Sequence, residues 1–148
     1  EKCDLHAIIE NSLAISKGQW KNNIEVIRQF ADYPIRIPGN VGKLHQVFIN
    51  LIVNAFQSIE DKGSVTITTE IKKNHAIVTI ADTGCGISKE KLSNITDPFY
   101  TTKEPGHGTG LGLSITYNII QDHKGTLEFQ SVLKKGTTVT VVLPAKFN

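Results

Sequence analysis

The stretch SVTITTEIKKNHAIVTIAD, residues 64–82, contains two runs in which apolar and polar residues alternate. Alternation with a period of two is typical of a strand with one buried face, and the polar segment KKNH at the junction favours a turn. The stretch therefore predicts a β-hairpin. Two further alternating runs, GTLEFQSVL (125–133) and GTTVTVVLP (136–144), predict a second strand pair that bends at residues 134–136.

Helical periodicity surrounds these strands. Apolar residues recur every three or four positions in three segments, at residues 4–16, 41–59 and 110–123. Asp4 can cap the first of these helices, and Gly125 is expected at the C-cap position of the third. The remaining predicted segments are a strand at 22–31, an irregular crossover with two prolines at 32–40, a short polar helix at 88–94 and a long loop at 96–110.

Locally paired strands combined with helices favour an α/β fold. We expect a two-layer sandwich, in which a mixed, mostly antiparallel sheet carries helices on one face. The chain has 148 residues and 39% hydrophobic content, which suits one domain with a real core. The sequence therefore predicts a single domain over residues 1–148.

The overall charge and hydropathy exclude some function classes. The net charge is only +2 and no basic cluster is interleaved with aromatic residues, so nucleic acid is not an expected partner. No apolar run is long enough for a membrane anchor and no signal peptide is evident, so we expect no direct membrane contact. Cys3 and Cys85 lack metal-ligand spacing and are expected to be reduced thiols of a cytoplasmic protein.

The predicted helix at 41–59 has two apolar faces separated by polar residues. The broad apolar face comprises Val41, Leu44, Val47, Phe48, Leu51, Ile52, Ala55 and Ile59, and a second patch comprises Ile49, Val53 and Phe56. Between them runs a polar stripe of Gln46, Asn50, Asn54, Gln57 and Asp61. Buried amides need partners, so the stripe either lines a polar ligand site, where an asparagine oxygen suits Mg²⁺, or consists of core amides bonded to backbone.

The segment IADTGCGI, residues 80–87, places Asp82 at a strand end before Gly84 and Gly86. A carboxylate beside glycines, which let a planar group approach, can accept a hydrogen bond from an exocyclic amine such as that of adenine. The alternative is a turn aspartate that binds local amides.

Residues 106–112, GHGTGLG, place a glycine at every second position just ahead of a predicted helix. The spacing does not fit a Walker A loop, since Leu113 and Ser114 follow the last glycine in place of a Lys-Ser/Thr pair. It does not fit a dinucleotide fingerprint, which needs a preceding strand and a third glycine where Leu111 or Leu113 stands. Bare amides that end at a helix N-terminus still favour a polyphosphate. The alternative is a flexible, glycine-rich surface loop.

Taken together, these motifs resemble those of a known family. HQVFINLIVNAFQSI (45–59) is similar to the N box, DTGCGI (82–87) to the G1 box, DPFYTTK (97–103) to the F box and GHGTGLGLSI (106–115) to the G2 box of sensor histidine kinases. Over residues 4–144 the chain resembles the catalytic, ATP-binding domain of these bacterial kinases, within the GHKL ATPase superfamily. The resemblance implies the Bergerat-type ATP-binding fold, with ATP and Mg²⁺ as ligands.

The resemblance also implies roles for individual residues. Asn54 would bind Mg²⁺, Asn50 would help to hold metal or phosphate, and Asp82 would accept from the adenine amino group, helped by water near Thr137. The base pocket would include Gly84, Gly86 and Ile87. The phosphate-binding segment would comprise Gly108, Thr109, Gly110, Leu111, Gly112 and Leu113. The ATP lid would include Phe99, Thr102, Lys103 and His107, with Lys103 either contacting phosphate or simply solvated.

Two departures refine this expectation. Related ATPases carry a glutamate base one turn before the metal-binding asparagine, where this chain has Asn50, so we expect slow hydrolysis. None of the five histidines precedes an acidic residue, as the phosphoacceptor of this family usually does. The chain is therefore expected to be a fragment of a longer protein, to donate phosphate to a histidine on a separate dimerisation domain, and to act upstream of a response regulator. A nucleotide-sensing module without transfer and an anti-sigma serine kinase remain alternatives.

Overall fold

The computed structural model describes residues 2–17, 23–59, 62–84, 111–132 and 135–145. The helices are α1 (Leu5–Lys17), α2 (Val41–Gln57) and α4 (Leu111–Asp122). The strands are β1 (Lys2–Asp4), β2 (Asn23–Gln29), β3 (Arg36–Pro38), β4 (Lys62–Lys72), β5 (His75–Asp82), β6 (Thr126–Val132) and β7 (Gly136–Pro144). The predicted short helix at 88–94 and the loop at 96–110 lie outside the described residues.

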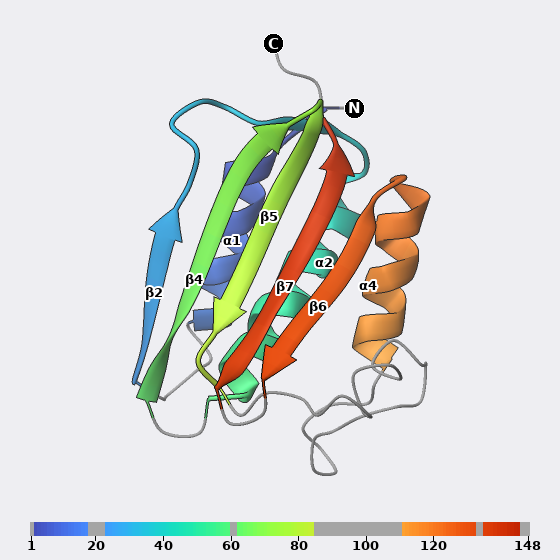
Figure 1. The fold of residues 1–148 in the computed structure, drawn as a ribbon. Coiled ribbons are helices and arrows are strands. Elements are labelled where there is room, and N and C mark those ends of the chain that lie inside the picture. The colour runs from blue at the N-terminus through green and yellow to red at the C-terminus, as the bar shows by residue number, and fades with distance from the viewer. Residues whose placement is uncertain (1, 18–22, 60–61, 85–110, 133–134, 146–148) are drawn as a thin grey trace.

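The main sheet has five strands in the order β2-β4-β5-β7-β6. Strand β2 runs parallel to β4, and the other neighbours are antiparallel. The helices lie on one face, with α2 between α1 and α4 (Figure 1). The predicted two-layer sandwich with a mixed, mostly antiparallel sheet is therefore confirmed.

The hairpin predicted from residues 64–82 is formed by β4 and β5. Its turn has Lys73 and Asn74 at φ values of 52° and 64°, which is the left-handed conformation that a two-residue hairpin turn of the favoured twist requires. Register then pairs Lys72 with His75 and Val65 with Asp82. The second predicted pair is also present, because β6 and β7 pair from Thr126 to Val132.

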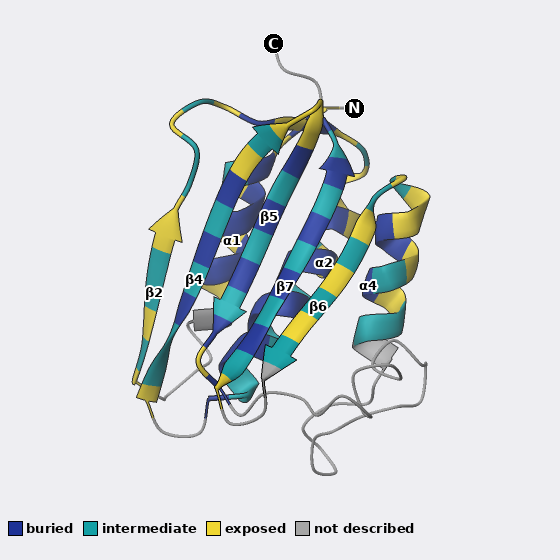
Figure 2. Ribbon diagram, in the orientation of Figure 1, coloured by how far each residue is buried: buried dark blue, intermediate teal, exposed yellow. Residues whose placement is uncertain are grey.

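The core lies between the sheet and the helices. Buried and half-buried residues alternate along β4, β5 and β7, and the buried side faces the helices (Figure 2). Helix α2 contributes the largest buried side chains, Phe48 and Phe56, both at most 1% exposed. Burial of each such ring stabilises the fold by about 1.5–3 kcal/mol. Helix α2 begins after Asn40, whose Oδ1 accepts from the Lys43 amide at 2.9 Å.

The end of α4 differs from the prediction. Lys124, rather than Gly125, takes the left-handed conformation, with φ 63°. The Gly125 amide donates to the Ile120 carbonyl at 2.8 Å and the Lys124 amide donates to that of Gln121 at 2.9 Å, which is a Schellman motif. Gly125 is glycine for another reason, since a Cβ there would lie 2.3 Å from the Val142 carbonyl oxygen on β7.

Two smaller predictions also need correction. Val41 was expected on the buried face of its helix but is 41% exposed, because it is the first residue of α2 and projects beyond the core. Residues 32–40 were expected to be irregular, yet Arg36–Pro38 pairs antiparallel with Lys2–Asp4. Such short strands carry too little periodicity to be recognised in the sequence.

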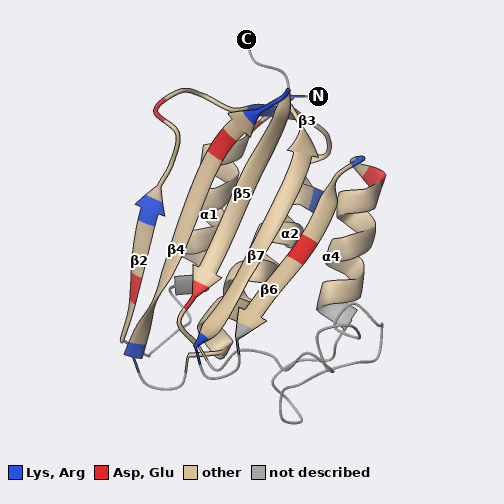
Figure 3. Ribbon diagram, in the orientation of Figure 1, with Lys and Arg blue, Asp and Glu red and all other residues tan. Residues whose placement is uncertain are grey.

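Charged residues are sparse on the central strands and lie mainly toward strand ends and the sheet edges in the described ribbon (Figure 3). One ion pair joins the two layers at an edge, where Arg28 Nε of β2 lies 2.9 Å from Glu10 Oε2 of α1. Both side chains are more than 40% exposed, so the pair contributes at most about 1 kcal/mol. No helix in the described ranges is long and apolar enough to cross a membrane.

Candidate functional site

Several predicted site residues gather at one end of the sheet. At this end, β5 terminates at Asp82, β7 begins, α2 ends and α4 starts (Figure 1). Register places Asp82 directly opposite Thr137 on β7, and both side chains face the helix layer. Residues 55 positions apart in the sequence are thus neighbours here, as their predicted joint role requires.

Asp82 is the central polar group of this end. Its side chain continues the buried face of β5 and is only 9% exposed. Its Oδ1 atom accepts from the Gly84 amide at 2.8 Å and from Ser58 Oγ at 3.0 Å. A hydrogen bond from the backbone of Thr137 also reaches the carboxyl group. An ionised carboxylate has about four acceptor positions, so three donors leave room for one more.

The environment of Asp82 acts on its pKa in two directions. Burial disfavours the charged carboxylate and raises its pKa above the ordinary value, and this is the largest effect. The hydrogen bonds from Gly84, Ser58 and Thr137 favour the charged form and oppose the rise. The fold therefore keeps a desolvated acceptor at the edge of its core and stabilises it with donors on several sides.

Gly84 has a steric reason to be glycine. A Cβ at this position would lie 2.1 Å from Ser58 Oγ and 2.5 Å from the Ser58 carbonyl oxygen. The chain that leaves β5 therefore passes directly against the last turn of α2. The role of Gly84 in shaping a base pocket stays a prediction. The absence of a side chain at Gly84 leaves the space that the Ser58 hydroxyl occupies beside Asp82.

Replacing Gly84 with alanine is expected to lower the free energy of unfolding by about 1–3 kcal/mol, because the added methyl group must displace the end of α2. Thermal or urea denaturation of the nucleotide-free domain measures this loss. Gly42→Ala is the matched control, since a Cβ there meets only Asn40 Oδ1 at 3.4 Å and helical alanine is favoured over glycine. A Gly84→Ala variant as stable as the wild type would contradict the steric argument.

Two serines belong to this end of the sheet although the sequence reasoning missed them. Ser58 caps the C-terminus of α2 and reaches Asp82. Ser131 on β6 lies opposite Thr137, with 2.8 Å between the two hydroxyl oxygens. Ser58 could have been found, because it lies one helical turn after Asn54 and extends the polar stripe.

The two asparagines of the stripe are both half-buried. Asn50 is half-buried, and its Nδ2 donates to Thr116 Oγ1 of α4 at 3.2 Å. Thr116 is fully buried, so this bond ties the two helices together. Asn54, one turn nearer to Asp82 along α2, is also half-buried, and its backbone carbonyl oxygen accepts from the Ser58 backbone amide at 3.1 Å. Asn50 thus has a structural partner, which matches the alternative of core amides in part.

Helix α4 begins at Leu111 on the same end of the molecule. The first amides of a helix have no partner within it and carry a partial positive charge, which favours anions. Leu113 is half-buried and packs against the core. The other predicted residues of this region lie outside the described residues: Gly86, Ile87, Phe99, Thr102, Lys103, His107, Gly108, Thr109 and Gly110.

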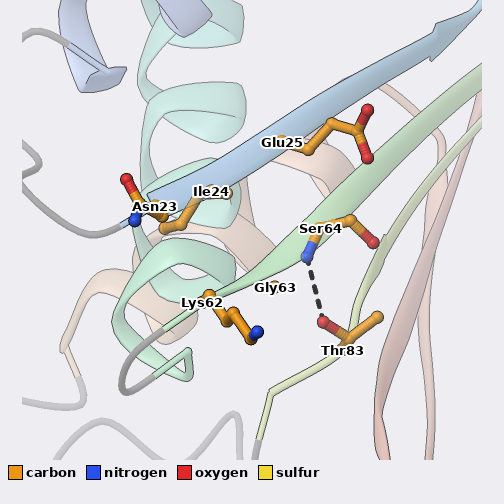
Figure 4. Close-up of a pocket in the computed structure, with 7 residues that line it drawn as sticks. All are labelled: Asn23, Ile24, Glu25, Lys62, Gly63, Ser64 and Thr83. Atoms are coloured by element: carbon orange, nitrogen blue, oxygen red, sulfur yellow. Dashed lines mark hydrogen bonds between the residues drawn. The ribbon is translucent and has the colours of Figure 1, made fainter.

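A separate, shallow cavity of about 650 Å³ lies beside the start of β2 and β4 (Figure 4). The described residues that line it are Asn23, Ile24, Glu25, Lys62, Gly63, Ser64 and Thr83. None of them is a predicted site residue, although Thr83 follows Asp82 directly. Thr83 Oγ1 accepts from the Ser64 amide at 3.0 Å and the Thr83 amide donates to the Ser64 carbonyl at 3.1 Å, which fixes the chain as it leaves β5.

The polar groups at this end of the sheet include one buried carboxylate and the amides of α2. Within the described residues, no group of three or more His, Cys, Asp or Glu side chains could hold a metal ion. Amide oxygens suit a Mg²⁺ ion that takes most of its ligands from water and phosphates. The buried carboxylate at Asp82 suits a neutral donor such as an exocyclic amine, which adds no second charge.

Comparison with known proteins agrees with this geometry. Residues 39–146 match the family described as histidine kinase-, DNA gyrase B-, and HSP90-like ATPase. Sporulation kinase C of Bacillus subtilis is 41% identical over 126 residues, which cover 84% of this chain and 29% of the kinase. Sensor histidine kinase ZraS of Escherichia coli is 35% identical over 143 residues, which cover 95% of this chain and 30% of ZraS.

The solved structures that resemble this chain are also of histidine kinases. The mycobacterial sensor histidine kinase MprB superposes with a TM-score of 0.88 at 25% identity, covering 99% of both chains. The catalytic domain of histidine kinase ThkA, in a nucleotide-free form, superposes with a TM-score of 0.86 at 29% identity, covering 97% of this chain and 94% of that chain. The chain spans less than a third of the length of the two curated relatives named above.

Proposed function

Because the chain belongs to the histidine kinase-, DNA gyrase B- and HSP90-like ATPases, we propose that it is the ATP-binding catalytic domain of a sensor histidine kinase. In this proposal it transfers the γ-phosphoryl group of ATP to a histidine side chain on a separate dimerisation domain. The observation that carries the proposal is Asp82, a buried carboxylate held by three donors at the end of β5, at the same end of the fold as the polar stripe of α2.

In the proposed complex, Asp82 accepts a hydrogen bond from the adenine amino group. The carboxyl group accepts most strongly when it is ionised, and the hydrogen bonds from Gly84 and Ser58 support that form. Thr137, opposite Asp82 in the sheet, would hold the water that joins the base to the protein. Gly84, Gly86 and Ile87 would line the base.

The asparagines of α2 and the start of α4 would hold the other half of the nucleotide. We assign Asn54 as the protein ligand of Mg²⁺, and Asn50 as a second contact to metal or phosphate. The amides of Leu111 and Gly112 in the first turn of α4 would face the phosphates, together with the glycine-rich segment before them. When bound, Mg²⁺ neutralises phosphate charge and so supports phosphoryl transfer.

The chain has no proton acceptor in the position where hydrolytic relatives are expected to have a glutamate. Asn50 stands one turn before Asn54, and its amide donates to Thr116. An amide cannot take a proton from water near neutral pH, so hydrolysis would be slow. Transfer to an imidazole nitrogen depends instead on positioning and charge stabilisation.

The partners follow from the same proposal. The acceptor histidine would lie on a helical hairpin of the longer protein, and a response regulator would receive the phosphoryl group afterwards. In this proposal, a lid over the nucleotide would include Phe99, Thr102, Lys103 and His107. We expect the domain to act in the cytoplasm, where ATP is available.

The direct test is transfer in trans. The 148-residue domain, incubated with Mg²⁺ and ATP labelled on its γ-phosphate, is expected to remain unlabelled and to label an added histidine hairpin of its own kinase. The product should be labile in acid and stable in base, because a phosphoramidate has this stability. Transfer should be slow, since separate chains lose the effective concentration that a linker provides.

A hairpin whose acceptor histidine is replaced by glutamine is the control and should take up no label. ATP binding without any transfer would favour the alternative of a nucleotide-sensing module. Label that is stable in acid would point to a serine kinase. Strong labelling of the lone domain would overturn its assignment as a donor only.

A further inference from the structure

We propose that Ser58 is a positioning residue for nucleotide binding, and that its hydroxyl holds Asp82 in the orientation that receives adenine. The proposal rests on the assignment of Asp82 to adenine made above. Ser58 lies in the segment that resembles the N box, but the resemblance implied no role for it.

The first support is the geometry of the hydroxyl. Ser58 Oγ lies 3.0 Å from Asp82 Oδ1 and 2.7 Å from the carbonyl oxygen of Ala55. A hydroxyl has a single proton, so it can donate to only one of these oxygens at a time. An ionised carboxylate is the stronger acceptor and draws the proton to Asp82. If Asp82 is protonated, the hydroxyl can return to Ala55 within its own helix.

The second support is the position of Ser58 between the two halves of the proposed site. Its backbone amide donates to the backbone carbonyl oxygen of Asn54, one helical turn earlier, and its side chain donates to Asp82. Ser58 therefore lies between the helical turn that carries Asn54 and the strand end that carries Asp82.

The third support is the close packing against Gly84. A Cβ at residue 84 would overlap Ser58 Oγ, and the Gly84 amide binds the same Asp82 oxygen that Ser58 binds. Gly84 and Ser58 thus hold Oδ1 from two directions, and this restricts rotation of the carboxylate. Glycine at this position is what allows the serine to approach.

In the described structure, no acidic or basic side chain is among the causes of the raised pKa of Asp82. The residues that bond to it or pair with it are Ser58 from α2, Val65 from β4, and Gly84 and Thr137, and none of these side chains is acidic or basic. The described lysines nearest along those strands, Lys62 and Lys135, are exposed at strand ends. Among the described residues, the Ser58 hydroxyl is the side-chain donor to this carboxyl group, and its hydrogen bond lowers the pKa of Asp82 against the larger effect of burial.

The test is calorimetric titration of the domain with Mg²⁺–ADP between about pH 5 and pH 8. Ser58→Ala is expected to weaken ADP binding by about 10-fold at neutral pH, because one hydrogen bond to a charged group is lost. Binding should also fail at a higher pH than in the wild type. Without the serine, the pKa of Asp82 rises further, so the carboxyl group becomes protonated, gains a donor and accepts more weakly at a pH where the wild type still binds.

Two variants separate positioning from a structural effect. Ser58→Thr keeps a hydroxyl and should restore most of the affinity and the pH profile. Ser12→Ala, which removes another buried hydroxyl that donates within its own helix, should change neither. In an Asp82→Asn background, Ser58→Ala should cause no further change in pH dependence, because the titrating group is absent.

The outcomes are distinct. A wild-type domain that binds no ADP would refute the proposed function itself. A wild-type domain that binds ADP, together with a folded Ser58→Ala variant of unchanged affinity and pH profile, would refute only the role of Ser58. A Ser58→Ala variant that loses affinity equally at every pH would show a packing role and would also overturn the proposal.

Discussion

Asp82→Asn lowers the affinity of the domain for ATP by about 100-fold or more, which is the expected cost when a buried acceptor is replaced by a group that presents a donor. Asparagine keeps the shape of the side chain and one oxygen. Its NH₂ group, however, would face the adenine amino group or the backbone of Thr137, both of which are donors. Isothermal calorimetry with ATP and ADP measures the loss.

The same argument predicts weak binding of GTP by the wild type, because guanine has an oxygen where adenine has its amino group. An ionised Asp82 would then face an acceptor. Equal affinity for ATP and GTP, or an Asp82→Asn variant with wild-type affinity for ATP, would remove Asp82 from the base site.

Stability of the nucleotide-free domain should respond to Asp82 with a defined sign. The pKa of Asp82 in the folded protein is raised above 3.8, its ordinary value, so the folded state holds this proton more tightly than the unfolded state does. The contribution of Asp82 to stability is therefore largest at low pH and is lost as pH rises from about 3.8 through the raised pKa. Melting temperatures measured across this window should fall with pH more steeply in the wild type than in Asp82→Asn.

Asn54→Ala should weaken Mg²⁺-dependent ATP binding by about 10-fold or more, because even the loss of an outer-shell partner of a metal ligand typically costs about 10- to 100-fold in metal affinity. The substitution leaves the core side of α2 intact, since Leu51, Ile52 and Ala55 are the buried neighbours on this helix. Titration of ATP with and without Mg²⁺ separates the metal contribution from the rest. The difference between the two titrations should shrink in the variant.

Asn50→Ala is the informative comparison. It removes the partner of the fully buried Thr116, so we expect it to lower the free energy of unfolding by about 1–3 kcal/mol. Compared with Asn50→Ala, Asn54→Ala should lower the free energy of unfolding less and should reduce the Mg²⁺ dependence of ATP binding more. If Asn54→Ala instead destabilises the domain strongly and leaves the Mg²⁺ effect unchanged, Asn54 is a core amide and not a metal ligand.

The candidate site was predictable where local pattern and a specific residue type coincide. Asp82 follows an alternating run and precedes glycines, so both its strand-end position and its chemistry can be read from the residues. The stripe of α2 was predictable for the same reason, because helical periodicity separates Asn50 and Asn54 from the apolar faces. The roles of these side chains toward ATP and Mg²⁺ remain proposals.

The partners of these residues were not predictable. Thr116 and Asn50 are 66 residues apart in the chain, and their hydrogen bond depends on how α4 packs against α2. The cap of α4 was also not predictable, because Lys124 takes the left-handed conformation there although Gly125 was expected to end the helix. The approach of β7 to Gly125, rather than a local backbone preference, requires the glycine there.

The sequence by itself determined the hairpin at residues 64–82, the long helix that begins at Val41, and the sandwich class, because alternation and helical periodicity report which side of each element is buried. Only the tertiary structure decided that Ser58 reaches Asp82 from 24 residues away and that Thr137 lies opposite it. The physical reason is that periodicity orients each element toward the core but contains no information on which ends of different elements meet. That choice is made by close packing, such as the contact of Gly84 with the last turn of α2.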